Sequence, residues 1–382
     1  MSKWVTVWGN ATSIADRRPE TYAKDITLRY PVTCAFGGNA IRLHFSNFCG
    51  TEAITLSKVS VAQAVSDREI NLKDAALVTF GGSESVTIAA GQEIFSDEIP
   101  FRVKPQSKIS VSVYLKDYTL MRSAVVITGP LSRGFFSVGD CVFSSVLPLK
   151  FTRTTQTFYF LTGIDLLTDD NNRSVILYGD SITAQSWADY LAIKCMSDPY
   201  NRTAVIRRAA SGTRVLREYD CITYESYGLK GENRFTREIS TVSGADTVII
   251  QQGINDIIHP VGTDINPFRP MSDLPTLDEL ENGIIYYVEE AKRKGLKVLL
   301  GTLLPIYGWR TYAPFREEMK NGFNAWLKSY KGADGCIDFD KALRSEENPC
   351  AFKDGFDSGD HLHPSEEAYK KMADVAFEYI KN

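Results

Sequence analysis

The hydrophobic pattern of this chain changes near residue 170, and the pattern after that point constrains the fold most strongly. Apolar runs of strand length alternate there with helical patterns. The runs lie at 174–179, 203–209, 246–252 and 297–303, and the helical patterns at 183–197, 277–294, 314–330 and 365–380. Short apolar strands separated by helices are typical of a parallel sheet with helices on both faces. We therefore predict a three-layer αβα domain over residues 169–382.

Residues 1–168 follow a different pattern. Apolar and polar residues alternate, for example over 41–46 and 108–115, and turns that contain Gly or Asn separate such runs. Many short strands with turn signals indicate an all-β sandwich of the jelly-roll type. The polar stretch 168–173 is the predicted boundary, which places the sandwich domain at 1–168 and the α/β domain at 169–382.

Composition limits the partners and the compartment. The 382 residues are 43% hydrophobic and 24% charged, with a formal net charge of −4, as in water-soluble globular proteins. This balance gives no reason to expect nucleic acid or an anionic membrane as partner. The N-terminus lacks a signal-peptide pattern and the seven cysteines are scattered, so we expect a cytoplasmic protein with neither a disulfide framework nor a zinc site. Removal of a signal peptide would instead imply secretion.

One serine occupies a position suited to nucleophilic attack. Ser181 follows a buried-strand pattern at 175–178 within Gly179-Asp180-Ser181-Ile182, and a helical pattern begins after it. A strand-to-helix turn exposes the hydroxyl and directs the N–H groups of the helix start toward negative charge. We therefore expect Ser181 to be a nucleophile for acyl transfer.

A serine hydroxyl needs a base to remove its proton. The chain has four histidines: His44, His259, His361 and His363. His363 lies three residues after Asp360, which places an acid and an imidazole on one short loop near the C-terminus. His44 sits in an alternating strand pattern, and His259 is either a loop residue or part of the site lining. From spacing along the chain, His361 competes with His363 as the base.

Ester hydrolysis also needs donors for the oxyanion of the tetrahedral intermediate. The backbone N–H groups of Ser181 and Gly212 and the side-chain amide of Asn255 can supply them. Asp180 and Asp256 are expected to hold the loops of the site by hydrogen bonds. Four separated segments thus contain all the groups of one acyl-transfer site.

These segments resemble the SGNH (GDSL-type) hydrolases, in which Ser, Gly, Asn and His come from four blocks of sequence. Ser181, Gly212, Asn255 and His363 fall in those blocks, and Asp360 takes the place of the third member of the triad. Further segments at 234–235, 302–305 and 337–340 resemble two-domain bacterial members. The resemblance implies that His363 is the base, because only His363 has the family's spacing from Asp360.

The resulting prediction is a serine esterase that needs no metal or other cofactor. We expect it to cleave short acyl esters, chiefly acetyl esters on a carbohydrate or a similar polar alcohol. Tyr307 and Trp309, in the loop after the 297–303 strand, are candidates for stacking on a sugar ring, although packing against the sandwich would explain them equally well. The alternatives are a lipase- or lysophospholipase-type acylhydrolase of the same family and a non-catalytic glycan-binding protein.

The sequence leaves open the role of the sandwich and the oligomeric state. The sandwich is either a carbohydrate-binding module or a structural partner that closes one side of the active site, and the short linker favours the second. The partner that we expect is a small-molecule or oligosaccharide ester substrate.

Overall fold

The computed structural model describes residues 1–15, 21–148 and 150–381. The chain forms two compact units. The first consists of Met1–Ser174 together with Arg202–Ile206 and Val242–Gly244. The second consists of Val175–Asn201, Arg207–Thr241 and Ala245–Asn382.

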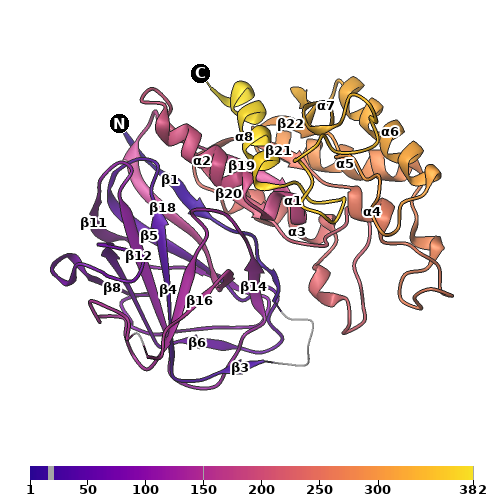
Figure 1. The fold of residues 1–382 in the computed structure, drawn as a ribbon. Coiled ribbons are helices and arrows are strands. Elements are labelled where there is room, and N and C mark those ends of the chain that lie inside the picture. The colour runs from indigo at the N-terminus through magenta and orange to yellow at the C-terminus, as the bar shows by residue number, and fades with distance from the viewer. Residues whose placement is uncertain (16–20, 149, 382) are drawn as a thin grey trace. The chain divides into compact units, whose positions relative to one another are not determined.

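The first unit is built mainly from two antiparallel sheets, drawn in indigo to magenta in Figure 1. Their strands are β1 Ser2–Gly9, β4 Ile26–Thr33, β5 Gly38–Ser46, β7 Lys58–Gln63, β8 Ala76–Val78, β10 Glu93–Phe95, β11 Ile99–Val103, β12 Lys108–Leu115, β15 Gly134–Val138, β16 Arg153–Thr155 and β18 Leu161–Asp169. One sheet has the order β1-β18-β5-β10, with β11 also paired to β5, and the other has the order β16-β15-β4-β12-β7-β8.

Shorter elements complete the first unit. They are β2 Ser13–Ile14, β3 Tyr22–Ala23, β6 Ile54–Leu56, β9 Val86–Ile88, β13 Thr119–Leu120, β14 Ser123–Val126, β17 Thr157–Tyr159 and the 3₁₀ turn Leu72–Asp74. Side chains alternate between buried and exposed along β11, because successive residues of a strand point to opposite faces. His44 lies buried on β5 and stacks on Phe95, as its strand pattern predicts. The predicted all-β architecture of this part of the chain is confirmed, and its strands are mostly antiparallel.

A five-stranded sheet organises the second unit. Its strands are β19 Arg173–Gly179, β20 Thr203–Ala209, β21 Ala245–Gln251, β22 Lys297–Gly301 and β23 Gly335–Ile337. The first residues of β19 and β20 are grouped with the first unit. They lie in the order β20-β19-β21-β22-β23, with β21, β22 and β23 paired in parallel. Along the chain, β20 is added on one side of β19, and β21 is then added on the other side of β19. The strand order therefore reverses between β19 and β21, which is where open α/β sheets bind ligands.

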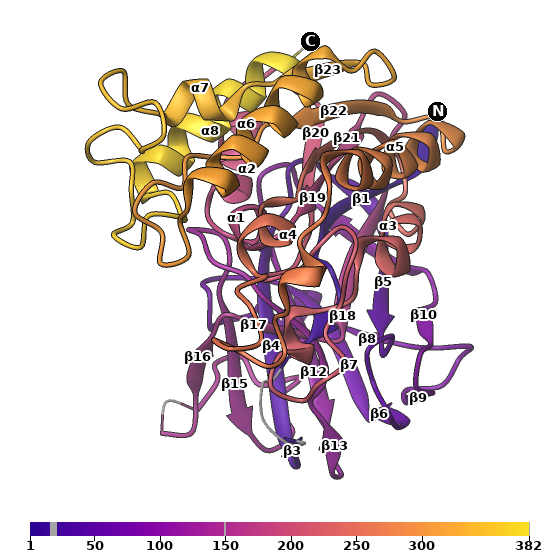
Figure 2. The same cartoon turned by 90° about the vertical axis from the view of Figure 1, so that its right-hand side faces the viewer.

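Helices cover both faces of this sheet. They are α1 Ser181–Ala184, α2 Trp187–Ser197, α3 Gly231–Ser240, α4 Ile254–Ile258, α5 Leu277–Arg293, α6 Pro314–Ser329, α7 Phe339–Leu343 and α8 Glu366–Ile380. Figure 2 shows α2 and α8 on one side of the strands and α3 and α5 on the other, and within each pair the helices pack together. The three-layer prediction is confirmed. Among the described residues, no helix is both long and apolar enough to cross a membrane.

The helix predicted at 183–197 is in fact two helices, because the backbone breaks after α1. Gln185 is extended, and the guanidinium of Arg207 donates to the carbonyl of Ala184 at 3.1 Å. Ser186 donates to Glu366 at 2.7 Å. The first bond uses the backbone carbonyl of Ala184, which a continuous helix would need for its own hydrogen bond. The short helices α3, α4 and α7 were not predicted.

Candidate active site

The turn between β19 and α1 places Ser181 at the carboxyl edge of the sheet. Asp180 caps α1 and accepts the N–H of Ile182 at 3.1 Å. A Cβ at Gly179 would lie 2.4 Å from the carbonyl oxygen of Gln251, so only glycine allows this approach of the backbones. Ser181 is the first residue of α1 and its side chain is partly exposed. The predicted strand–turn–helix arrangement is present.

His363 reaches Ser181 from a loop that lies 182 residues further along the chain. Its Nε2 is 2.8 Å from Ser181 Oγ, and its Nδ1 is 2.7 Å from Asp360 Oδ2. The other carboxylate oxygen of Asp360 accepts the N–H groups of Leu362 and His363 at 3.0 and 2.8 Å. Partial burial opposes ionisation of Asp360, but these hydrogen bonds outweigh it and hold its pKa below the usual value.

The segments of Gly212 and Asn255 meet beside this turn. The amide of Asn255 donates to the carbonyl of Thr213 at 3.0 Å, and the N–H of Ala210 donates to the carbonyl of Gly179 at 3.2 Å. Gly212 has a φ of +81°, a conformation that favours glycine. Within the described residues, the N–H groups of Ser181 and Gly212 donate to no other protein group. Two backbone donors therefore remain available near the serine.

The buried carboxyl groups of Asp180 and Asp256 hold the loops of the site by hydrogen bonds. Asp256 accepts the N–H groups of Val215 and Leu216 at 2.8 and 3.0 Å, and Asp180 caps α1. Burial raises the pKa of Asp180 to about 7, and nearby Asp256 adds to this shift. Burial likewise raises the pKa of Asp256 to about 6, although the two N–H groups oppose it. The expected role of both residues in holding loops is confirmed.

The comparison with known protein families agrees with this geometry. The family described as GDSL-like lipase/acylhydrolase matches residues 170–376, which is more than half of the chain. The chain belongs to this family. It is therefore a hydrolase, and the predicted family resemblance is confirmed.

Three solved structures illustrate what the chain is similar to. A putative acylhydrolase from Bacteroides fragilis is 21% identical, with 56% of this chain and 88% of that chain covered and a TM-score of 0.41. A GDSL-like lipase from Bacteroides thetaiotaomicron is 20% identical, with 56% and 90% covered and a TM-score of 0.39. A variant of an acetyl xylan esterase from Geobacillus stearothermophilus is also 20% identical, with 55% and 94% covered and a TM-score of 0.43. A comparison with curated proteins finds no significant match.

Arg234, a buried arginine of this acylhydrolase, connects segments of the site by hydrogen bonds. Arg234 donates to Thr213 Oγ1 at 2.9 Å and to the carbonyl of Arg208 at 3.0 Å, and its charge is paired with Glu238 at 3.0 Å. Its side chain is only 2% exposed. In the sequence, Arg234 stood out only as part of the segment 234–235, which resembles two-domain bacterial members of the family, and it was given no role in the site. Its burial and its bonds to Thr213 and Arg208 identify it as a support of the site.

His259 lies in an aromatic cluster. It follows α4, is 6% exposed, and its Nδ1 is 3.2 Å from the hydroxyl of Tyr219. Its ring lies 5.1 Å from that of Tyr227, centre to centre. The ring of Tyr227 in turn packs on Gly212, where a Cβ would lie 2.4 Å from it. His259 is therefore a buried support of the Gly212 loop.

Tyr307 and Trp309 lie in a loop that follows β22. The hydroxyl of Thr311 anchors this loop to the carbonyl of Ile258 at the end of α4, at 3.0 Å. Tyr307 is 51% exposed, whereas Trp309 is half-buried with the guanidinium of Arg310 over its ring. The loop thus borders the Asn255 segment. The predicted contact of these rings with substrate stays a prediction.

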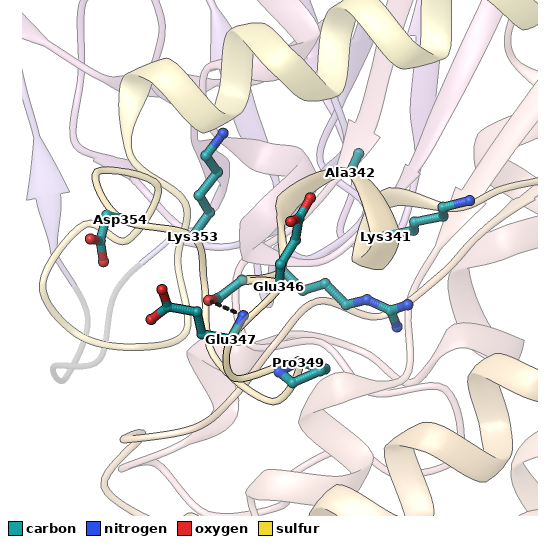
Figure 3. A pocket seen from close by; sticks show the side chains of 9 residues that line it. Lys341, Ala342, Glu346, Glu347, Pro349, Lys353 and Asp354 are labelled. Atoms are coloured by element: carbon teal, nitrogen blue, oxygen red, sulfur yellow. Dashed lines mark hydrogen bonds between the residues drawn. The ribbon is translucent and has the colours of Figure 1, made fainter.

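A hollow of about 680 Å³ opens elsewhere on this unit, at α7 and the loop after it (Figure 3). It is lined by Lys341, Ala342, Arg344, Ser345, Glu346, Glu347, Pro349, Lys353 and Asp354. None of these is a predicted site residue. In the described part of the chain, no three or more His, Cys, Asp or Glu side chains are grouped to hold a metal ion.

Proposed function

We propose that this hydrolase is a serine esterase with Ser181 as nucleophile, His363 as base and Asp360 as the orienting carboxylate. One observation carries the proposal: Ser181, His363 and Asp360 form a continuous chain of contacts of 2.8 and 2.7 Å. A nucleophile within hydrogen-bond reach of a base that a third group orients is the arrangement needed for covalent acyl transfer. The assembled chain also argues against the non-catalytic glycan-binding alternative.

The geometry supports a two-step reaction. Asp360 accepts the Nδ1–H of His363, which leaves Nε2 unprotonated and able to accept the hydroxyl proton of Ser181. Ser181 Oγ attacks the acyl carbonyl, and the imidazolium then returns the proton to the leaving alcohol. Water, activated by the same Nε2, attacks the acyl-enzyme and releases the acid.

The oxyanion of each tetrahedral intermediate needs donors that are already in place. We assign this role to the N–H groups of Ser181 and Gly212 and to the amide of Asn255. The bond from Asn255 to Thr213 supports the assignment, since it fixes the amide and leaves its second hydrogen available. Each such donor typically lowers the barrier by roughly 3–4 kcal/mol.

Removal of the nucleophile tests the esterase proposal directly. Ser181→Ala is expected to lower kcat for p-nitrophenyl acetate by about 10⁴-fold or more and to prevent labelling by a fluorophosphonate probe. Circular dichroism and thermal unfolding should match the wild type, because the serine is partly exposed and its hydroxyl supports no other element. Wild-type turnover by a folded Ser181→Ala protein would refute the mechanism.

For the substrate, we infer short acyl groups, chiefly acetyl, on a carbohydrate or another polar alcohol. The exposed ring of Tyr307 supports this inference, because its loop is anchored to the end of α4 and aromatic faces pack well on the apolar faces of sugar rings. The test compares kcat/KM for p-nitrophenyl acetate and p-nitrophenyl palmitate, followed by acetate release from acetylated xylo-oligosaccharides. A preference for palmitate would favour the lipase-type alternative. Loss of the oligosaccharide activity alone in Tyr307→Ala or Trp309→Ala would support stacking.

A further inference from the structure

A second histidine–aspartate pair lies on the same loop as the first. His361 Nδ1 is 2.5 Å from Asp357 Oδ2, and the other carboxylate oxygen of Asp357 accepts the N–H groups of Gly359 and His361 at 2.8 and 3.0 Å. Asp360 holds His363 in the same way, through Nδ1 and two backbone N–H groups. The loop therefore presents two imidazoles, each oriented by its own carboxylate.

The two imidazoles differ in what their outer nitrogen contacts. His363 Nε2 faces Ser181, and its side chain is 22% exposed. The side chain of His361 is 51% exposed, and within the described residues its Nε2 has no hydrogen-bond partner. An oriented imidazole with an unused nitrogen, two residues from the proposed base, is able to contact a ligand that reaches Ser181.

The backbone around His361 is held in a costly conformation. His361 has a φ of +64°, a left-handed conformation that is uncommon outside glycine. The ring also packs on Gly308, where a Cβ would lie 2.8 Å from Cγ of the imidazole. Gly308 follows Tyr307, so the imidazole packs on the loop that carries this exposed tyrosine. Such strain is concentrated at functional sites.

We propose that His361 is a substrate-binding residue whose Nε2 accepts a hydrogen bond from a hydroxyl group on the alcohol part of the ester. The proposal rests on the esterase function above and names the group that the site recognises. When the proton of the imidazole lies on Nδ1, which faces Asp357 Oδ2, Nε2 offers an acceptor and no donor.

Substrates that share an acyl group isolate this contact. We suggest glycerol monoacetate and the analogue in which both free hydroxyls are methylated, which keeps the ester and removes the hydroxyl donors. The quantity to measure is the ratio of their kcat/KM values. A single neutral hydrogen bond is expected to make this ratio about 5–10 in the wild type.

Two amide variants separate recognition from support of the loop. The amide of Asn ends three bonds from Cα, as His Nδ1 does, whereas that of Gln ends four bonds away, as Nε2 does. His361→Asn therefore keeps a partner for Asp357 and tolerates the positive φ but does not reach the substrate. We expect the ratio to fall toward one in His361→Asn and to stay well above one in His361→Gln. Glu346→Gln, on the exposed rim of the hollow in Figure 3, serves as the control with the wild-type ratio.

A purely structural role of His361 would lower both kcat/KM values in proportion and leave the ratio unchanged, which would overturn the proposal. Equal ratios in the Asn and Gln variants would also overturn it. If both variants fail to fold, the wild type still tests the proposal, because a ratio of the two kcat/KM values near one in the wild type would overturn it. The esterase proposal fails separately, if Ser181→Ala retains turnover of either ester.

Discussion

The aspartates of this site occupy two opposite environments, an exposed rim that carries Asp360 and a buried floor formed by Asp180 and Asp256. At the rim, Asp360 is 43% exposed and its pKa is held below the usual value by hydrogen bonds from its own loop. At the floor, Asp180 and Asp256 are buried, and burial raises their pKa values to about 7 and about 6. The same residue type therefore ionises readily at the rim, whereas burial opposes its ionisation at the floor.

The difference separates the chemistry from the support. A carboxylate that stabilises an imidazolium must stay ionised during turnover, and the hydrogen bonds that Asp360 accepts favour its ionised form against partial burial. A carboxyl group that only accepts backbone N–H bonds needs no charge, so it tolerates burial. We therefore expect changes at the rim to remove activity and changes at the floor to alter stability.

The largest effect is expected at the rim. Asp360→Asn should lower kcat for p-nitrophenyl acetate by about 10⁴-fold, because an amide at this position favours the wrong tautomer of His363. The melting temperature should change little, since Asn still accepts a backbone N–H bond. A variant with near-normal kcat would show that Asp360 only shapes the loop.

The next effect is expected in the support of the site. Arg234→Met removes one of the two ion-pair partners of the buried Glu238, leaving Arg237, and also removes the bonds to Thr213 and Arg208. Breaking a buried pair outright typically costs about 3–5 kcal/mol of unfolding free energy, so with Arg237 still in place we expect a loss toward the lower end of this range, which urea denaturation measures. The double variant Arg234→Met/Glu238→Leu should recover part of the loss. An unchanged midpoint for the single variant would contradict a supporting role.

A third test uses the raised pKa of Asp180. The folded protein holds a proton on this group that the unfolded chain releases near pH 4, so this group's contribution to stability decreases as pH rises from about 4 to about 7. Each unit of pKa difference corresponds to about 1.4 kcal/mol. Asp180→Asn keeps the helix cap but does not titrate. Urea denaturation should show less loss of stability over this pH range in the variant, and parallel profiles would contradict the shift.

The smallest effect concerns a residue that belongs to both regions. Asn255 is buried and bonded to Thr213, yet we assign its second amide hydrogen to the oxyanion. Asn255→Ala should reduce kcat by about 10²–10³-fold with little change in KM, because the contact forms in the transition state. Steady-state kinetics on p-nitrophenyl acetate measures this. An increase confined to KM would assign Asn255 to ground-state binding.

Local features of the sequence determined much of this protein. The alternation of strands and helices predicted the α/β layer, and Ser181 was placed on its turn by the strand before it and the helix after it. The loop that carries the acid and the imidazole was also located, because Asp360 and His363 are only three residues apart. These features depend on neighbours along the chain, so they could be predicted from the sequence. The domain boundary at residue 168 and the cytoplasmic location stay predictions.

Tertiary structure alone decided which distant groups meet. The contact between Ser181 and His363 spans 182 residues, and only the family resemblance selected His363 over His361 in advance. The break between α1 and α2, the burial of Arg234 and the packing of His361 on Gly308 had no signal in the sequence. Each depends on hydrogen bonds or burial contributed by segments far along the chain, and periodicity and spacing carry no information about such partners.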